Sequence, residues 1–363
     1  MIQKIITITA VLFCALTVSA QRDDEYSYLF FENDDSSKAV FKAHADCFFK
    51  NNEYFGDFAK GYTLIGYMLQ PEFIYRPVDK VEISVLWNVL KYSGKDDFSD
   101  YKPYFRIKFS PTKKVSLILG RLDGTLSHRL IEPIYKPERY YLNNIENGLQ
   151  CHYKTDSYRG ELWLNWEKFL LWNDPWQELL TVGHKSELKI LEKGLTSFFL
   201  TGEALISHRG GQIDLSDDKV KTLENGALGF QLKRPKLTFD FRFVQYHAID
   251  PTYEVPYLDG YAFYNKLFLK FKNFGFVCGH WQGNCFMNFK GEELFSSEAI
   301  EPENNKNIRS VLFNELFYSQ QFYKTFSIKV GANSYFNILN GDFEYTYMLS
   351  FVYNQNFPIR KNK

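Results

Sequence analysis

Apolar and polar residues alternate along most of this chain, and this period of two restricts its fold more than any other feature. The segment 341–357 is the clearest case, since every second residue is apolar or aromatic: Phe343, Tyr345, Tyr347, Leu349, Phe351 and Tyr353. The same pattern recurs at 81–89, 237–243 and 326–333. A period of two places alternate side chains on opposite faces of a β-strand. The sequence therefore predicts many strands with one apolar face.

The composition indicates where those apolar faces lie. The chain has 35 Phe and 25 Tyr, yet its mean hydropathy is −0.33. Beyond residue 20 it has no apolar run of the about 18 residues that a membrane-spanning helix needs. Only helices and closed barrels satisfy their backbone hydrogen bonds in lipid. A soluble β-sandwich or β-solenoid would also alternate, but these strands run long and no helical pattern interrupts them. We therefore expect an all-β, transmembrane antiparallel β-barrel.

The first twenty residues have the pattern of an export signal. Lys4 is their only charged residue, the run 5–18 is apolar, and Val18-Ser19-Ala20 has small residues where a signal peptidase cleaves. We expect a cleaved signal peptide at 1–20, a periplasmic segment at 21–37, a single barrel at 38–357 and a short basic tail at 358–363. Export of a barrel from a Gram-negative cell predicts an outer-membrane location.

The spacing of the strands gives an independent check on the barrel. Sixteen candidate strands lie near 38–50, 60–75, 79–92, 102–110, 112–122, 146–154, 157–167, 177–191, 194–208, 220–232, 236–248, 260–271, 274–282, 308–320, 325–336 and 342–357. Fourteen or eighteen strands also fit the pattern. Links after even-numbered strands are short, whereas most links after odd-numbered strands are long, with 123–145 and 283–307 among the longest. Outer-membrane barrels alternate short periplasmic turns with long outer loops in this way.

The chain resembles the porin-like outer-membrane barrels of Bacteroidota. The resemblance rests on Gln21 directly after the predicted cleavage site, on the aromatic alternating strands and on a terminal strand that ends near Phe357. It implies a barrel surrounded by the lipid bilayer and the lipopolysaccharide leaflet, and a homo-oligomer is one arrangement that fits it. The tail at 358–363 departs from the aromatic ending that such barrels have.

A barrel of about sixteen strands leaves an aqueous interior. The alternation assigns polar and charged residues to that interior, because burying them in lipid would cost several kcal/mol each. These pore-lining candidates are Lys42, His44, Asp46, Glu82, Arg106, Lys108, Glu161, Glu203, Asp240, Arg242, Lys266, Lys270 and Lys329. The alternative is a packed ionic network in a closed barrel.

The loop at 123–145 is dense in charged and aromatic residues. Its charged candidates for a constriction are His128, Arg129, Glu132, Lys136, Glu138 and Arg139. By the resemblance, this third outer loop would fold inward and select solutes, since rings of charge at a constriction set which solutes pass. An ordinary surface loop is the alternative.

Signals for other chemistry are poor. The sequence has no Gly-x-Ser-x-Gly elbow, no His-Glu-x-x-His and no phosphate-binding glycine loop, so we expect no enzyme, no cofactor and no metal site. A membrane-embedded acyl hydrolase is the alternative, because Ser207-His208 and Ser127-His128 pair suitable residue types, although adjacent residues on a strand point to opposite faces. Its 43 basic and 43 acidic residues argue against a nucleic-acid partner. Cys278 and Cys285 are candidates for a disulfide, because an exported protein meets an oxidising compartment.

Together these features predict a porin-like channel for passive or weakly selective passage of small hydrophilic solutes. The alternative is a non-conducting barrel that serves as a subunit of an outer-membrane uptake, export or assembly complex.

Overall fold

The computed structural model describes residues 37–211, 213, 215–249 and 255–360, together with Tyr26 and Leu29. The predicted signal peptide and most of the predicted segment 21–37 lie outside the described residues. The strands are β1 (Ala39–Glu53), β2 (Tyr62–Val78), β3 (Val81–Tyr92), β4 (Asp100–Thr112), β5 (Val115–Arg121), β6 (Asn147–Lys154), β7 (Tyr158–Lys168), β8 (Glu178–Lys193), β9 (Thr196–Gly210), β10 (Lys221–Arg234), β11 (Leu237–Ala248), β12 (Asp259–Phe271), β13 (Phe274–Asn284), β14 (Ile308–Phe322), β15 (Phe326–Asn337) and β16 (Phe343–Arg360).

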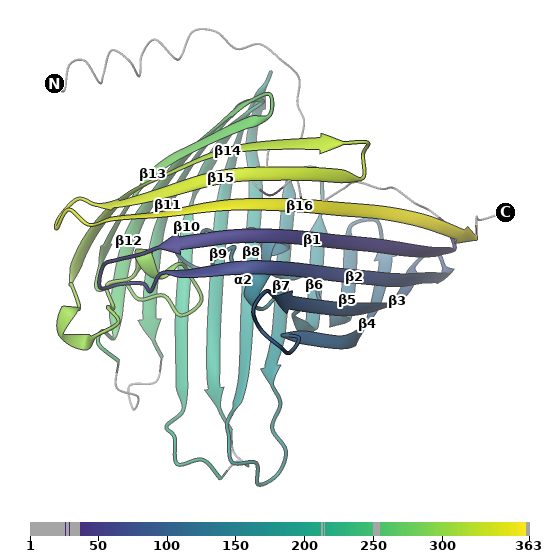
Figure 1. The fold of residues 1–363 in the computed structure, drawn as a ribbon, viewed down its shortest axis with the longest axis horizontal. Helices are drawn as coiled ribbons and strands as arrows, with labels where there is room; N and C mark the ends of the chain where they lie inside the picture. The colour runs from purple at the N-terminus through teal and green to yellow at the C-terminus, as the bar shows by residue number, and fades with distance from the viewer. Residues whose placement is uncertain are drawn as a thin grey trace.

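The sheet closes on itself because the first and last strands pair. Each strand is antiparallel to its neighbours in sequence, and β1 pairs with β16 from Ala39 opposite Arg360 to Glu53 opposite Tyr345. In Figure 1 the strands β16, β1 and β2 cross the strands β7 to β10 of the opposite wall at a steep angle, as tilted barrel strands do. The predicted sixteen-strand barrel is confirmed, and every predicted strand overlaps an observed one. Strand β16 continues through Arg360, beyond the boundary predicted at 357.

Short turns lie at one end of the barrel and longer loops at the other. The loops, taken as the outer ones, are L1 (54–61), L2 (93–99), L3 (122–146), L4 (169–177), L5 (211–220), L6 (249–258), L7 (285–307) and L8 (338–342). Their short helices are η2 (Thr125–His128) and α2 (Arg139–Leu142) in L3, and η3 (Glu293–Phe295) and η4 (Pro302–Asn304) in L7. No helix among the described residues is long and apolar enough to cross a membrane.

The two faces of the wall differ as the alternation predicts. Large apolar side chains such as Phe105, Leu162 and Leu316 are exposed on the outside of the strands, where lipid would cover them. Charged side chains such as Arg242 and Lys329 are buried on the inside. An apolar band outside and a polar wall inside are typical of membrane barrels.

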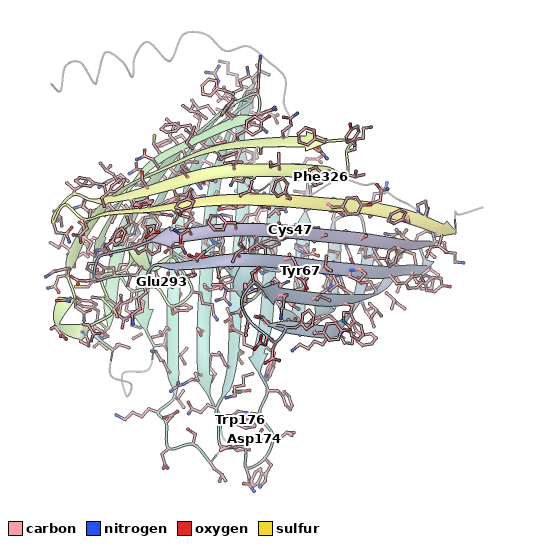
Figure 2. The ribbon with its side chains drawn as sticks, viewed as in Figure 1. Cys47, Tyr67, Asp174, Trp176, Glu293 and Phe326 are labelled. Carbon is pink, nitrogen blue, oxygen red and sulfur yellow. The ribbon has the colours of Figure 1, made fainter. Side chains whose placement is uncertain are left out.

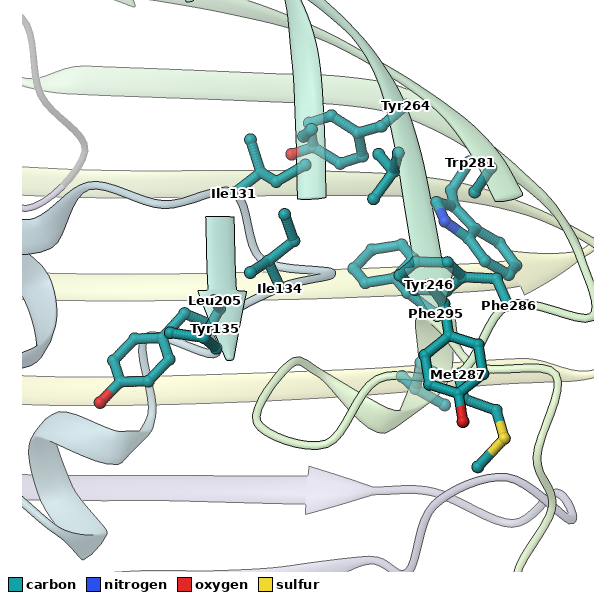
Figure 3. Close-up of a cluster of buried hydrophobic side chains, with 14 of the residues drawn as sticks. Ile131, Ile134, Tyr135, Leu205, Tyr246, Tyr264, Trp281, Phe286, Met287 and Phe295 are labelled. Carbon is teal, nitrogen blue, oxygen red and sulfur yellow. The ribbon is translucent and has the colours of Figure 1, made fainter. Parts of the chain in front are cut away.

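Aromatic side chains fill much of the interior toward the loop end. Figure 3 shows this cluster, in which Tyr246, Tyr264 and Trp281 from β11, β12 and β13 lie close to Phe286 and Phe295 of L7. Ring pairs such as Tyr264 with Phe295, 6.3 Å between centroids at 90°, have the edge-to-face geometry that aromatic side chains prefer. The interior of this part of the barrel is therefore a packed core.

Candidate functional site: the loop-filled lumen

Two outer loops, L3 and L7, enter the lumen and bind each other there. The backbone N–H of Lys136 donates to the carbonyl of Lys290 at 2.9 Å, and that of Glu292 donates to the carbonyl of Glu132 at 2.9 Å. The Lys136 ammonium also lies 2.8 Å from Glu293, which Figure 2 places among the side chains at the loop end. Since backbone bonds and an ion pair join the two segments, L3 and L7 form one plug.

His128 fixes L3 to the inner wall. Its Nε2 lies 2.8 Å from Glu146 and its Nδ1 lies 2.5 Å from Glu161 on β7, while its ring stacks on Trp163 at 3.7 Å. Burial lowers the pKa of His128, but Glu146 and Glu161 outweigh burial and raise this pKa to about 10. Burial raises the pKa of Glu146, but His128 and Tyr135 more than compensate and lower it to about 2. The imidazolium is thus held between two carboxylates.

A cluster of charges on β8, β9 and β11 forms a second anchor for L3. The Glu203 carboxylate pairs with Lys185 and lies 3.4 Å from Nε of Arg242, which in turn pairs with Asp240. The other oxygen of Glu203 accepts the backbone N–H of Ile131 in L3 at 2.9 Å. All of these charged side chains are buried. Removal of one partner would leave buried charge unpaired, which is costly.

The third anchor involves the C-terminal part of L3. Glu138 accepts hydrogen bonds from Lys50 at 2.9 Å and from Asn52 at 3.0 Å, both on β1. Burial raises the pKa of Glu138, but the neighbouring Lys50 and Lys136 more than offset burial and keep this pKa below its usual value. The Glu292 carboxyl of L7 is buried nearby, and burial raises its pKa to about 8.

A cavity of about 180 Å³ lies between Tyr140 of L3 and the inner wall at β1, β2 and β5. Its polar lining includes Lys42 and His44 of β1, Glu72 of β2 and Arg121 of β5. Arg121 pairs with Glu72, and Nε2 of His44 lies 3.0 Å from the Tyr140 hydroxyl of L3. Open space with mixed charge therefore lies beside the plug.

The structure places all the predicted pore-lining residues at inward positions, because each shares its strand parity with buried residues. Many of them are occupied in ion pairs: Glu82 with Arg76, Arg106 with Asp123, Glu161 with His128, Glu203 with Lys185, Asp240 with Arg242, and Lys329 with Glu315. Of the set, only Lys42 and His44 border the described cavity. This wall thus resembles the packed ionic network that the sequence left open as an alternative.

All six predicted constriction residues lie in L3, which does fold inward. His128, Lys136 and Glu138 are buried, whereas Arg129, Glu132 and Arg139 are partly exposed. Sequence reasoning missed the contribution of L7. A signal was present, because apolar Phe286, Met287, Leu294 and Phe295 interrupt an otherwise polar loop.

The predicted disulfide between Cys278 and Cys285 is wrong, because both cysteines are free. Extended chain of β13 covers most of the separation between them. Seven residues at about 3.3 Å each span far more than a disulfide can bridge.

The fold and the lumen define a closed antiparallel β-barrel of sixteen strands, and the solved structures with a similar fold are outer-membrane proteins. OprD from Pseudomonas aeruginosa is similar at a TM-score of 0.55 with 8% identity, over 92% of this chain and 99% of that one. A loop-deletion mutant of OmpT from Vibrio cholerae is similar at a TM-score of 0.53 with 9% identity, over 88% of this chain and 100% of that one. OccAB4 from Acinetobacter baumannii is similar at a TM-score of 0.51 with 12% identity, over 90% of this chain and 100% of that one. At such identities the similarity shows the fold alone.

The sequence identifies a family that the fold does not. A model described as Lipid A 3'-O-deacylase-type matches residues 31–362, so this chain belongs to that family. No curated protein matches the sequence. The family is named for an enzyme, so our expectation of no enzymatic activity is wrong. The motifs that the expectation relied on are contiguous in sequence, and a catalytic group assembled from separate strands leaves no such motif.

Proposed function

We propose that this protein hydrolyses acyl ester bonds of a lipid A-type glycolipid in the outer leaflet of the outer membrane. The observation that carries the proposal is the filled lumen. L3 and L7 pack against the inner wall with Ile134, Phe286 and Phe295 fully buried between them. A packed core is a poor route for a bulky substrate. A lipid substrate needs no such route, since it reaches the outside of the barrel from within the leaflet.

The match of the family model to the whole barrel supports the same reaction class. The protein would meet its substrate in the lipopolysaccharide leaflet, where the ester carbonyls lie at the edge of the hydrocarbon. Whether this barrel comes from Bacteroidota, as the resemblance implies, stays a prediction.

The test is to incubate the refolded full-length barrel with purified lipid A in detergent micelles and follow its mass. Loss of one acyl chain, with release of the matching fatty acid, is the expected result. Unchanged lipid A after prolonged incubation with barrel of confirmed folding would contradict the proposal.

A second candidate is passage of small hydrophilic solutes through the lumen, as the sequence predicts. The cavity of about 180 Å³ with charged walls favours it. Conductance in planar bilayers and swelling of proteoliposomes would detect such passage. A silent barrel would instead fit the non-conducting subunit that the sequence left open, and stable co-purifying chains or a homo-oligomer would support that role.

A further inference from the structure

The cavity between L3 and the inner wall carries positive charge in excess. Its charged lining residues are Lys42, Glu72 and Arg121. Arg121 pairs with Glu72, whose carboxylate also accepts the Ser84 hydroxyl at 2.7 Å. Lys42 forms no ion pair and no side-chain hydrogen bond with any residue that the structure describes. The lining thus contains one neutralised ion pair and one ammonium group that has no partner of its own.

This arrangement departs from the rest of the inner wall. Several buried cations elsewhere on the wall have carboxylate partners, among them Lys185 with Glu203 and Lys329 with Glu315. A charge in a low-dielectric interior needs such a partner, because its desolvation is otherwise uncompensated. Lys42 has open space beside it instead of a carboxylate. That space is where an anion would lie.

Two amide oxygens next to Lys42 also lack a partner. Asn354 of β16 lies directly opposite His44 of β1, and Asn356 lies opposite Lys42. The side-chain oxygens of both asparagines are buried and accept no hydrogen bond from the described part of the chain. Asn354 is only 4% exposed and lines the cavity. Buried acceptors without a donor are rare in folded proteins, so these oxygens indicate a donor that comes from outside the protein.

The pairing of three neighbouring strands sets these groups in two adjacent rows. In one row His44 lies between Asn354 of β16 and Gln70 of β2. In the next row Lys42 lies between Asn356 and Glu72 of the same two strands. Figure 1 shows β16, β1 and β2 running side by side. Because the groups stand on paired strands, their spacing is fixed by the wall and not by a loop.

Arg121 enters the same space because of the glycine before it. Leu119 of β5 is exposed on the outward face, so a regular strand would also point Arg121 outward. Gly120 has a φ of 95°, a conformation that favours glycine, and a Cβ at this position would clash with the carbonyl oxygen of Phe105. This break in the strand turns Arg121 to the inside, where it pairs with Glu72.

We propose that this cavity binds a small hydroxycarboxylate. The carboxylate would lie on the Lys42 ammonium, with Nε of Arg121, which is also buried without a partner, as a second donor. A hydroxyl of the ligand would donate to the side-chain oxygen of Asn354. A cavity of about 150 Å³ can hold benzene, so a cavity of about 180 Å³ admits a ligand of roughly six to eight non-hydrogen atoms. A few convergent polar groups of this kind are how small-molecule sites fix their ligands.

The first experiment titrates folded full-length barrel in detergent with three probes, followed by calorimetry. Sodium glycerate has both the charge and the hydroxyls, propionate lacks the hydroxyls, and glycerol lacks the charge. Glycerate should bind saturably at one site per barrel, and propionate and glycerol should each bind at least about 10-fold more weakly. A cavity that holds water only would give no saturable binding of glycerate, which would overturn the proposal. Equal affinity for glycerate and glycerol, or for glycerate and propionate, would overturn it as well.

The second experiment repeats the titration with variants whose folding is confirmed by the heat-modifiable shift. Lys42→Met should weaken glycerate binding by at least about 10-fold, whereas Lys42→Arg, which keeps the charge, should stay within a few-fold of wild type. Asn354→Leu should lower the affinity for glycerate to that for propionate and leave the affinity for propionate unchanged. Wild-type glycerate affinity in Lys42→Met would overturn the proposal.

The matched control is Lys233→Met. It removes the same charge from the inner side of β10, where Lys233 lies 4.0 Å from Glu187 and does not line the cavity. Its affinity for glycerate should equal that of wild type, and an equal loss in Lys233→Met and Lys42→Met would show that the whole lumen, and not this cavity, attracts the anion. Binding of glycerate does not depend on lipid A hydrolysis, so failure of either proposal leaves the other standing.

Discussion

The inward-folded loops L3 and L7 differ sharply from the projecting loops L4 and L5, although both pairs contain large apolar residues. L3 buries Ile134 completely, whereas Trp172 of L4 is 74% exposed. Figure 2 shows Asp174 and Trp176 of L4 at the tip of the segment that extends beyond the wall. L4 and L5 hold each other through backbone hydrogen bonds from Asn173 to Ile213 and from Leu215 to Asp174, both 2.9 Å.

Charged anchors on the wall account for the difference. L3 reaches the wall through His128, Glu138 and the backbone of Ile131, and each contact ends on a charged side chain of a strand. L4 has polar contacts of another kind, such as the backbone N–H of Leu171 donating to Asp174 of the same loop at 2.7 Å. The projecting loop L5 also pairs with a strand, through Asp218 and Arg209 of β9, but both of these side chains are exposed. The comparison indicates that buried ion pairs with the wall, and not hydrophobicity alone, accompany the inward folding of a loop.

The largest expected effect comes from the wall side of an anchor. Glu203→Ala would leave the buried charges of Lys185 and Arg242 short of a partner, which costs about 3–5 kcal/mol. Thermal unfolding in detergent, followed by the heat-modifiable shift of barrels in gels, measures the change. Asp174→Ala in L4 is the control and should have little effect. Equal stability of the two variants would remove the distinction between anchored and projecting loops.

Deletion of 126–140 from L3 should open the lumen beside the existing cavity. We expect single-channel conductance to rise several-fold above that of the wild type, because the deletion removes most of L3, one of the two loops that form the plug. Deletion of 170–175 from L4 is the control and should leave conductance unchanged. A silent L3 deletion with intact folding would show that L7 and the wall residues close the lumen without L3.

The His128 anchor should make the docking of L3 depend on pH. The pKa of His128 is raised to about 10, so its contribution is complete below about pH 6.5, the unfolded value, and is lost as pH rises through 10. The pKa of Glu146 is lowered to about 2, so its contribution is complete above about pH 4.5 and is lost as pH falls through 2.

Docking of L3 should therefore be strongest between about pH 4.5 and 6.5. Cleavage of L3 by added protease, or the near-ultraviolet dichroism of stacked Trp163, reports its release at alkaline pH. His128→Gln should remove most of the alkaline dependence. An identical pH profile in that variant would show that other groups, such as Glu292, control docking.

The smallest effect is expected at the tip of L4. Trp172→Ala should change the free energy of unfolding by less than about 0.5 kcal/mol, because an exposed side chain gives up little packing. Thermal unfolding beside the Glu203 variant gives the comparison. A loss of 2 kcal/mol or more, well above the surface range of roughly 0.5 kcal/mol, would mean that lipid or another chain covers the tip.

Sequence reasoning found the wall and one half of the plug. The inward facing of Asp240 and Arg242 could be predicted from the sequence, because successive side chains of a strand alternate between its two faces regardless of the rest of the fold. The partners of the charged side chains could not be predicted, because they come from other parts of the chain: Glu161 of β7, for example, contacts His128 of L3. The same holds for the surroundings of Lys42, since β16 lies beside β1 only when the barrel closes.

The amino-acid sequence by itself determined the strands, their facing and the even strand count, because period two is a local property that every strand displays on its own. Only the tertiary structure decided that the lumen is filled, that L7 shares the plug with L3, and that cysteines 278 and 285 stay apart. Those outcomes depend on which side chains meet across a closed wall. Barrel closure brings residues far apart in the chain to within hydrogen-bonding distance, and no pattern along one segment records that.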